Sequence, residues 1–508
     1  MAATFKQSVR GPNHPCYVKD TWCSLYHGRY PGREYMAMAR TLIRDGYVVT
    51  VDPDRNVYPG GFAVIEGTDI TGVGPEDAAP AADGFDDVID ASGCLVLPGL
   101  INMHQHHWYT LFKGLADGYL LEDWVTQFLL PLSAQLSPDA MRVSSYVAGL
   151  EMLSTGTTCS LNHSVTTTSP AHVAATIEPQ RELGIRQVFG KEMRCKTPGN
   201  PHHPLDLDAA LDDFRTTCEE WDGSGGGLVR MAMALESNAH WVAAGMSTET
   251  LIKKGYDLAR DLDIKITAHI SGGTFALEMG FLKYLRETGR TDTRYLMQLG
   301  ILDETWLMIH GIHVTELDLE HMALTGASFV YTPASEAVRG GGIGPAANAA
   351  RAGVNTALGT DGPMVDYSVD MIEQMKVATL MQHNRHLDPT RMPVERTLEM
   401  ATINAANALG LGDEIGSIES GKRADIAIFD MIKPHIGVLH RPLSNFVSAG
   451  RGADARAVLV NGKIVYQDGK FTSGPDVAGI FTGAEKHAGI ALAAAGLTSR
   501  LAPAWRSS

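Results

Sequence analysis

Between residues 95 and 358, short apolar runs alternate with longer segments of helical composition, such as 140–154, 248–262 and 368–384. Short apolar runs bounded by turn residues are typical of buried parallel strands. We expect eight such strands: Leu95–Asn102, Thr158–Asn162, Arg186–Phe189, Leu228–Leu235, Ile264–Ala268, Trp306–Ile309, Ser328–Tyr331 and Asn355–Leu358. Eight successive strand and helix units predict an α/β fold of the (β/α)₈ or TIM barrel type.

Two β-rich blocks flank this region. The first has short β-type runs at 41–43, 47–51, 62–65 and 70–73, separated by turn residues such as Asp45-Gly46 and Pro59-Gly60-Gly61. The second has runs at 424–429, 457–460 and 463–466. Because a closed barrel brings the ends of its chain together, the two blocks are predicted to form one small β-sandwich.

These patterns divide the chain into four parts. We expect an irregular N-terminal extension over 1–38, a composite β-sandwich from 39–97 plus 412–475, a barrel over 98–411 and a C-terminal tail over 476–508. The extension has no sustained period of two or 3.6 residues, so it must dock on a surface to become ordered.

Composition excludes several classes of partner. The 508 residues, 44% hydrophobic and 20% charged, are those of an ordinary globular protein, and the formal charge of -16 argues against nucleic acid or an anionic membrane. No apolar run approaches the roughly 20 residues that cross a bilayer, and the start lacks a secretory pattern, so we expect a cytoplasmic protein. Its six cysteines contain no C-x-x-C pair and are interpreted as reduced thiols.

Ligand-type side chains occur where the predicted strands end. His104 and His106 follow the first strand, and residues i and i+2 of a strand project to the same face. His269, His310 and Asp361 follow the fifth, sixth and eighth strands. The carboxyl ends of barrel strands converge on one face, and imidazoles with a carboxylate suit a divalent first-row metal. We expect one such ion per subunit, Zn²⁺ first, with Fe, Mn or Co as alternatives.

Several motifs in the same order resemble the amidohydrolase superfamily, in its cytosine deaminase, S-adenosylhomocysteine deaminase and triazine hydrolase branch. The resemblance covers about residues 40–470 and rests on these segments: 98–106 (PGLINMHQH), 114–117 (GLAD) with Asp123-Trp124, 309–311 (IHG), 332–335 (TPAS), 353–362 (GVNTALGTDG) and 416–425 (GSIESGKRAD).

This resemblance implies roles for the ligand-type residues. His104, His106, His269 and Asp361 would bind one metal, which lowers the pKa of bound water toward 7 and generates hydroxide. Asp361 would accept the proton of that water and pass it to the leaving group. His310 would contact the substrate or donate to the atom on which negative charge accumulates. By analogy with the family, we also expect a homo-oligomer.

Two segments depart from the branch. Its members usually carry His-x-x-Glu after the fifth strand, where the Glu protonates a ring nitrogen, whereas this chain has His269-Ile270-Ser271-Gly272. The tail after the last ligand is also altered, to Asp361-Gly362-Pro363-Met364-Val365-Asp366. Hydrolysis of an amide or urea-type bond needs no ring-nitrogen acid, so it stays open beside deamination. Glu236 or Glu192 is a candidate to replace the missing acid.

Other residues near the strand ends are candidate substrate contacts: His163, Trp108, Trp124, His240 and Glu236. Three of these residues have a structural alternative: His163 as a packed core histidine, Trp124 as an anchor of the following helix and Glu236 as part of an ion pair. Lys191 is a further candidate, either as a carbamate that bridges a second metal or as a salt-bridged lysine.

The sequence therefore predicts a metal-dependent hydrolase of carbon–nitrogen bonds other than peptide bonds. Its expected substrate is small, neutral and rich in nitrogen, and the bond is of the amide or urea type or joins an amino group to an N-heterocycle. A hydrolase that displaces chloride from a heterocycle and an inactive scaffold of the same fold are the alternatives.

Overall fold

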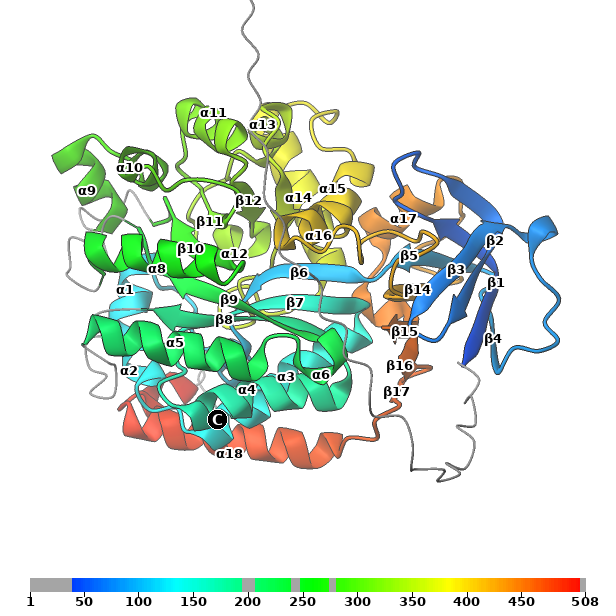
Figure 1. Ribbon diagram of the computed structural model, residues 1–508, viewed down its shortest axis with the longest axis horizontal. Coiled ribbons are helices and arrows are strands. Elements are labelled where there is room, and N and C mark those ends of the chain that lie inside the picture. Colours follow the sequence, from blue (N-terminus) through cyan, green and yellow to red (C-terminus); the bar gives the residue numbers. More distant parts are fainter. Residues whose placement is uncertain (1–38, 194–205, 239–246, 274–279, 503–508) are drawn as a thin grey trace, which may run out of the picture. The chain divides into compact units, whose positions relative to one another are not determined.

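The computed structural model describes residues 39–193, 206–238, 247–273 and 280–502 (Figure 1). The predicted N-terminal extension, residues 1–38, lies outside these ranges. None of the helices within the described ranges is long and apolar enough to cross a membrane.

Eight parallel strands hydrogen-bond to one another in the order in which they occur along the chain. They are β6 (Leu100–Gln105), β7 (Thr157–Ser164), β8 (Arg186–Met193), β9 (Val229–Leu235), β10 (Lys265–Ile270), β11 (Trp306–His310), β12 (Ser328–Tyr331) and β13 (Thr356–Leu358). A parallel bridge between Gln105 and Asp361 joins the first strand to the residues that follow the last. The predicted barrel is confirmed.

The expectation of one continuous strand over Leu95–Asn102 is wrong. Residues Cys94–Pro98 form β5, which pairs with β1 and β14 in a different sheet, and the barrel strand β6 begins only at Leu100. At the crossing, Gly99 N–H donates to Asp425 O at 2.8 Å and Leu100 N–H donates to Gly156 O at 3.0 Å. A Cβ at Gly99 would lie 2.1 Å from Thr158 Oγ1, so only glycine fits between the two sheets.

The other sheet combines both ends of the described chain, seen as blue and orange strands in Figure 1. Its strands are β1 (Arg40–Val49), β2 (Val57–Glu66), β3 (Asp69–Pro75), β4 (Asp87–Asp90), β5, β14 (Ile426–Asp430), β15 (Ala455–Val460), β16 (Lys463–Gln467) and β17 (Lys470–Phe471). Antiparallel pairing of β5 with β14 connects the N-terminal strands to the C-terminal ones. The small β domain expected from the two blocks is therefore confirmed, with its nine strands hydrogen-bonded as one sheet.

The turns expected within the first block are wrong. Asp45 and Gly46 lie inside β1, where the pairing register with β2 shifts, and Pro59–Gly61 lies inside β2. Asp45 has a φ of 60°, and a Cβ at Gly46 would meet Val96 Cγ2 at 2.6 Å. The dipeptide therefore forms a bulge against the neighbouring strand, because the register shift and close packing leave no room for a hairpin turn.

Helices form much of the described chain, and most of them connect and cover the barrel strands. They are α1 (Leu121–Trp124), α2 (Leu130–Ser133), α3 (Pro138–Ser154), α4 (Pro170–Leu183), α5 (Leu207–Trp221), α6 (Ser224–Gly227), α8 (Glu249–Asp261), α9 (Gly280–Thr288), α10 (Asp292–Leu299), α11 (Glu316–Thr325), α12 (Pro333–Val338), α13 (Ala346–Arg351), α14 (Met371–His386), α15 (Val394–Met400), α16 (Ile403–Leu409), α17 (Pro442–Ala449) and α18 (Val477–Ala494). Apolar residues of α16 join the core inside the barrel, beside Ile101 and Leu161.

The first and last barrel strands are joined by a buried polar seam. Asn102 Nδ2 donates to Thr360 Oγ1 at 2.9 Å, and Thr360 N–H donates to Asn102 Oδ1 at 3.1 Å. The carbonyl of His104 accepts from the N–H groups of Thr360 and Asp361, at 3.0 and 2.9 Å. The seam therefore fixes His104 next to Asp361.

We expect Asn102→Ala to lower the free energy of unfolding by about 1–3 kcal/mol, because it leaves buried partners of the seam without hydrogen bonds. Asn348→Ala is the matched control, since Asn348 donates to Glu316 at an exposed site. Thermal and urea denaturation of the two variants would measure the difference. Equal unfolding midpoints would show that the seam does not hold the barrel closed.

Candidate metal centre

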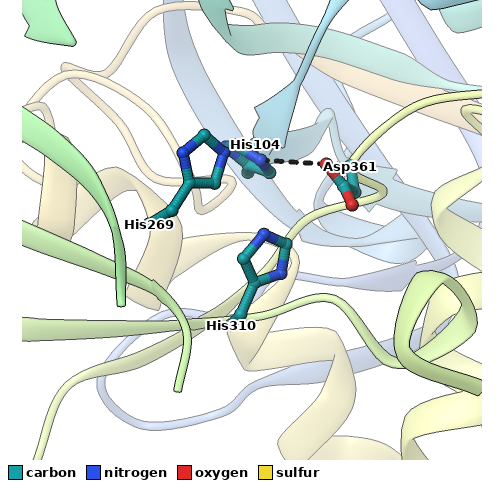
Figure 2. Close-up of side chains that lie close together, drawn as sticks. All are labelled: His104, His269, His310 and Asp361. Atoms are coloured by element: carbon teal, nitrogen blue, oxygen red, sulfur yellow. Dashed lines mark hydrogen bonds and ion pairs between the residues drawn. The ribbon is translucent and has the colours of Figure 1, made fainter. Parts of the chain in front are cut away.

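Four ligand-type side chains meet at the carboxyl ends of the barrel strands. His104 lies in β6, His269 in β10 and His310 at the end of β11, while Asp361 follows β13. One ligand atom from each lies within 4.8 Å of the others, and Figure 2 shows the three rings and the carboxylate around a common centre. His106, just after β6, is adjacent, with Nε2 3.4 Å from Asp361 Oδ1. The structure thus brings together all five residues that the sequence predicted.

The backbone at two of these residues is unusual. His310 has a φ of 69° and Asp361 a φ of 67°, and each is followed by a glycine that also has positive φ. A residue other than glycine in this left-handed region costs on the order of 1–3 kcal/mol, and such strain gathers at functional sites. The turns end β11 and lead out of β13 at the points where the two side chains enter the cluster.

Buried acceptors orient three of the imidazoles. His106 Nδ1 lies 2.6 Å from His163 O, His269 Nδ1 lies 2.6 Å from Glu236 Oε1, and His310 Nδ1 lies 2.7 Å from Glu336 Oε1. Each acceptor holds the proton on Nδ1 and thereby leaves the lone pair on Nε2. Carboxylates and carbonyls orient metal-binding histidines in this way.

Asp361 connects the imidazoles to a second polar group. Its Oδ1 lies 3.2 Å from His104 Nε2, while Oδ2 accepts from Ser335 Oγ at 2.6 Å and lies 3.3 Å from Arg339 Nη2. Burial by itself would raise the pKa of Asp361, but the charge of His310 and the hydrogen bonds with His104 and His106 hold that pKa well below its usual range. The carboxylate is therefore ionised, as a metal ligand must be.

The donor set fits a divalent first-row metal. Burial lowers the pKa of His104 and of His106, so both rings are neutral near pH 7 and have a lone pair for an ion. His104 Nδ1 is fully buried, and it has no hydrogen-bond partner within the part of the chain that the structure describes. Neutral imidazoles with one ionised carboxylate are ligands typical of zinc and similar ions.

Glu236 and His163 lie directly behind His269. Glu236 Oε1 accepts from His269 and lies 3.3 Å from His163 Nε2, and Oε2 accepts from Asn238 Nδ2 at 2.9 Å. Burial acts to raise the pKa of Glu236, but the neighbouring His269 charge and hydrogen bonds from both rings hold it well below the usual value. Glu236 is thus placed to orient His269, with both its oxygens already engaged as acceptors.

The remaining predicted residues are placed differently from one another. Trp124 lines a cavity of about 470 Å³, whereas Trp108 is buried beside Tyr109 and Phe112 and does not line it. His240 lies outside the described residues. Lys191 Nζ forms an ion pair with Asp213 of α5 and donates to Thr217 Oγ1 at 2.7 Å, which favours the salt-bridged lysine over a metal-bridging carbamate.

Three chain segments form the cavity that Trp124 lines. They are the loop after β6 together with α1, the end of α12 together with the residues that follow it, and the loop after β13. The lining residues are Ala116, Asp117, Gly118, Tyr119, Leu120, Trp124, Val338, Arg339, Gly340, Met364, Val365 and Tyr367. Arg500 contacts the loop after β6. Its Nη2 donates to Leu115 O at 3.0 Å, and its guanidinium lies 4.5 Å from the centre of the Tyr119 ring.

Glu336 and Arg339 were missed by the sequence interpretation. Glu336 lies in α12, the short helix that follows β12, and Arg339 directly follows its last residue; they are one and four residues beyond the Thr332–Ser335 motif. Arg339 Nη2 lies 3.4 Å from Glu336 Oε2, and both side chains are buried. Charged residues directly after a barrel strand were the available signal, since that is where active sites of this fold are built.

Comparisons with known proteins found a matching family, similar sequences and similar folds. The sequence profile of the amidohydrolase family matches residues 95–465. A 5-methylthioadenosine/S-adenosylhomocysteine deaminase of Syntrophobacter fumaroxidans is 32% identical over 436 residues, which cover 85% of this chain and 93% of the relative. An adenosine deaminase structure from Xanthomonas campestris with bound zinc has a TM-score of 0.81 at 25% identity, covering 90% of this chain and 99% of that one. A triazine hydrolase from Arthrobacter aurescens shares the fold, with a TM-score of 0.79 at 21% identity and coverage of 89% and 99%.

We expect Glu236→Gln to weaken metal binding about 10- to 100-fold, because a neutral amide orients His269 and raises its basicity less than a carboxylate does. Competition with a chromophoric chelator would measure the affinity. Glu249→Gln is the matched control, since Glu249 pairs with Lys253 on the exposed surface of α8. Unchanged affinity in Glu236→Gln would exclude this role.

Proposed function

Because the chain belongs to the amidohydrolase family, we propose that it removes an amino group by hydrolysis from a small, neutral N-heterocycle. As the sequence predicts, it is a hydrolase that acts on carbon–nitrogen bonds other than peptide bonds. The cluster of His104, His269, His310 and Asp361 is the observation that carries the proposal. The named activity of the 32% identical relative, deamination of a purine nucleoside derivative, supports an aminated heterocycle as the substrate.

We assign His104, His106, His269 and Asp361 as ligands of one divalent metal, and Zn²⁺ is supported by the zinc in the similar adenosine deaminase structure. When bound, such an ion supplies water activation, since it lowers the pKa of water at the site toward about 7. Glu236 orients His269 for this role, through the 2.6 Å contact with Nδ1.

The protein residues move protons and stabilise charge. Water adds to the amino-bearing carbon, a C–O bond forms and the C–N bond breaks. Asp361 accepts the proton of the attacking water and returns it to the nitrogen, which leaves as ammonia or an amine. His310 contacts the substrate through Nε2, while Glu336, at 2.7 Å from Nδ1, orients the ring and offsets positive charge that develops on it.

Hydrolysis of an amide or urea-type bond is the second candidate, and Gly272 favours it. This residue stands where the branch usually carries the acid that protonates a ring nitrogen. Displacement of chloride from a heterocycle is a third candidate reaction, because the same activated water could attack a carbon that carries chlorine. The complete ligand set argues against an inactive scaffold.

The proposal includes a cytoplasmic location. Cys94, Cys159 and Cys218 are free and buried, as expected of thiols in a reducing compartment. The homo-oligomeric state stays a prediction by analogy with the family.

A substrate panel tests the proposed reaction. The purified zinc-loaded protein is offered aminated purines, pyrimidines and triazines, amides, ureas and chlorinated triazines, and the release of ammonia, amine and chloride is measured. We expect ammonia or amine from an aminated heterocycle, and Asp361→Asn to lower kcat by at least about 10²-fold while the fold is kept, because the proton carrier is lost. Chloride alone, or wild-type rates in Asp361→Asn, would contradict the proposal.

Gly272→Glu separates the two leading candidates. A Cβ at Gly272 would meet only Ile270 O, at 3.8 Å, so a side chain fits there. If the reaction is deamination without the usual acid, the new carboxyl group should raise kcat/KM on aminated heterocycles by about 10- to 100-fold relative to Gly272→Gln. A gain confined to amides or ureas, or equal rates in the two variants, would favour the second candidate.

A further inference from the structure

Arg339 is a buried cation of the cavity that the proposed proton transfers do not use. Its side chain is 9% exposed, although it lines the 470 Å³ cavity. It lies between that cavity and the metal cluster, because Nη2 is 3.3 Å from Oδ2 of Asp361. A group bound at Arg339 would therefore lie next to Asp361, the carboxylate proposed to carry the proton.

The hydrogen bonds of Arg339 leave one end of the guanidinium available. Nε donates to Ser335 O at 3.3 Å, and Nη2 faces Glu336 Oε2 and Asp361 Oδ2. Within the described residues, Nη1 has neither a hydrogen bond nor an ion pair. Since guanidinium donors lie in one plane, holding Nε and Nη2 also fixes the direction of Nη1.

We propose that Arg339 Nη1 binds a carbonyl oxygen of the substrate, so that the enzyme selects heterocycles that carry an oxo group beside the amino-bearing carbon or one ring atom away. The inference deepens the proposed function and rests on it. It narrows the substrate class from aminated heterocycles in general to amino-oxo heterocycles.

The charges around the cavity favour a neutral acceptor over an anionic one. Asp117 also lines the cavity, and its carboxylate accepts from the hydroxyl of Tyr367. Asp361 and Glu336 lie beside the guanidinium, so a substrate anion at Arg339 would meet two carboxylates there and a third, Asp117, in the cavity wall. A carbonyl oxygen accepts from Arg339 without the repulsion that a substrate carboxylate would meet.

The cavity walls suit a flat ring. Trp124 Nε1 lies 3.3 Å from Met364 Sδ, and both side chains line the cavity. Tyr109 stacks on His106 with ring centres 4.4 Å apart and contacts Trp124 edge to face at 5.7 Å. Aromatic packing therefore connects His106 of the cluster to Trp124 in the cavity wall, and an aromatic wall suits a planar substrate.

The test compares substrates that differ by one oxo group. The pairs are cytosine with 4-aminopyrimidine and guanine with 2-aminopurine, each with wild type, Arg339→Lys and Arg339→Met. Arg339→Lys keeps a positive charge between Glu336 and Asp361 but removes the planar set of guanidinium donors, including Nη1. Arg351→Lys on α13 is the control, because Arg351 is exposed. Metal content and thermal midpoint are recorded for every variant.

We expect Arg339→Lys to lower kcat/KM on the oxo member of a pair by about 10- to 100-fold and to change the other member less than threefold, as loss of a charge-assisted hydrogen bond predicts. Arg351→Lys should change neither. Comparing variant with wild type within each pair removes the difference in intrinsic reactivity. Equal losses on both members would overturn the proposal and leave Arg339 as a group that only balances charge.

Calorimetry with uracil and xanthine tests recognition without turnover. We expect wild type to bind at least one of them and Arg339→Met, with its metal retained, to bind it at least tenfold more weakly. If wild type hydrolyses nothing in the panel but shows this difference, the proposed reaction fails and the recognition by Arg339 stands. A second outcome is that wild type hydrolyses amino heterocycles while neither kcat/KM nor calorimetric binding depends on Arg339, and a third is that it prefers rings that bear a carboxylate. Either result would overturn the proposed role of Arg339 and leave the proposed reaction standing. Absence of both turnover and binding overturns both.

Discussion

The carbonyl of His104 accepts hydrogen bonds from the N–H groups of both Thr360 and Asp361, at 3.0 and 2.9 Å. These bonds join the first barrel strand to the residues that follow the last, and the same residues carry two of the clustered side chains. Closure of the barrel and assembly of the cluster are therefore one event. A Cβ at Gly359 would lie 2.7 Å from His104 N, so the close approach requires glycine. A shift of one residue in this pairing would turn the His104 side chain to the opposite face of its strand.

Around that seam, the buried charges hold one another in place. Glu236 and Glu336 each accept from the Nδ1 atom of one clustered imidazole, and Arg339 lies between Glu336 and Asp361. Buried charges are costly unless they are paired and hydrogen-bonded, and here the partner of each is a group that the proposed chemistry uses. The strained turns at His310 and Asp361 are tolerated within the same network. Rigidity and reactivity thus come from one set of contacts.

The features predicted correctly depend on local pattern. Apolar runs and helical segments indicated the barrel, and the family resemblance carried by the segments around His104 and Asp361 is confirmed. The roles of the individual residues stay predictions. Features that depend on packing between distant residues were missed or predicted wrongly. The strand breaks at Gly99 because Gly99 donates to Asp425 and packs closely against Thr158. The bulge at Gly46 forms because Gly46 packs closely against Val96. A place for Glu336 and Arg339 in the site can be recognised only in the folded protein, where the residues after β12 contact His310 at the end of β11 and Asp361.

The pairing of β5 with β14 has a consequence for synthesis of the chain. The strands that meet are Cys94–Pro98 and Ile426–Asp430, so about 330 residues are translated after the first before its partner exists. During that time β5 presents an open sheet edge of buried, apolar residues, the kind of surface that pairs with other chains. The barrel, made from the intervening residues, can form first and bring its two ends together. Until β14 has been made, the open edge of β5 can therefore pair with other chains, even when the barrel has already folded.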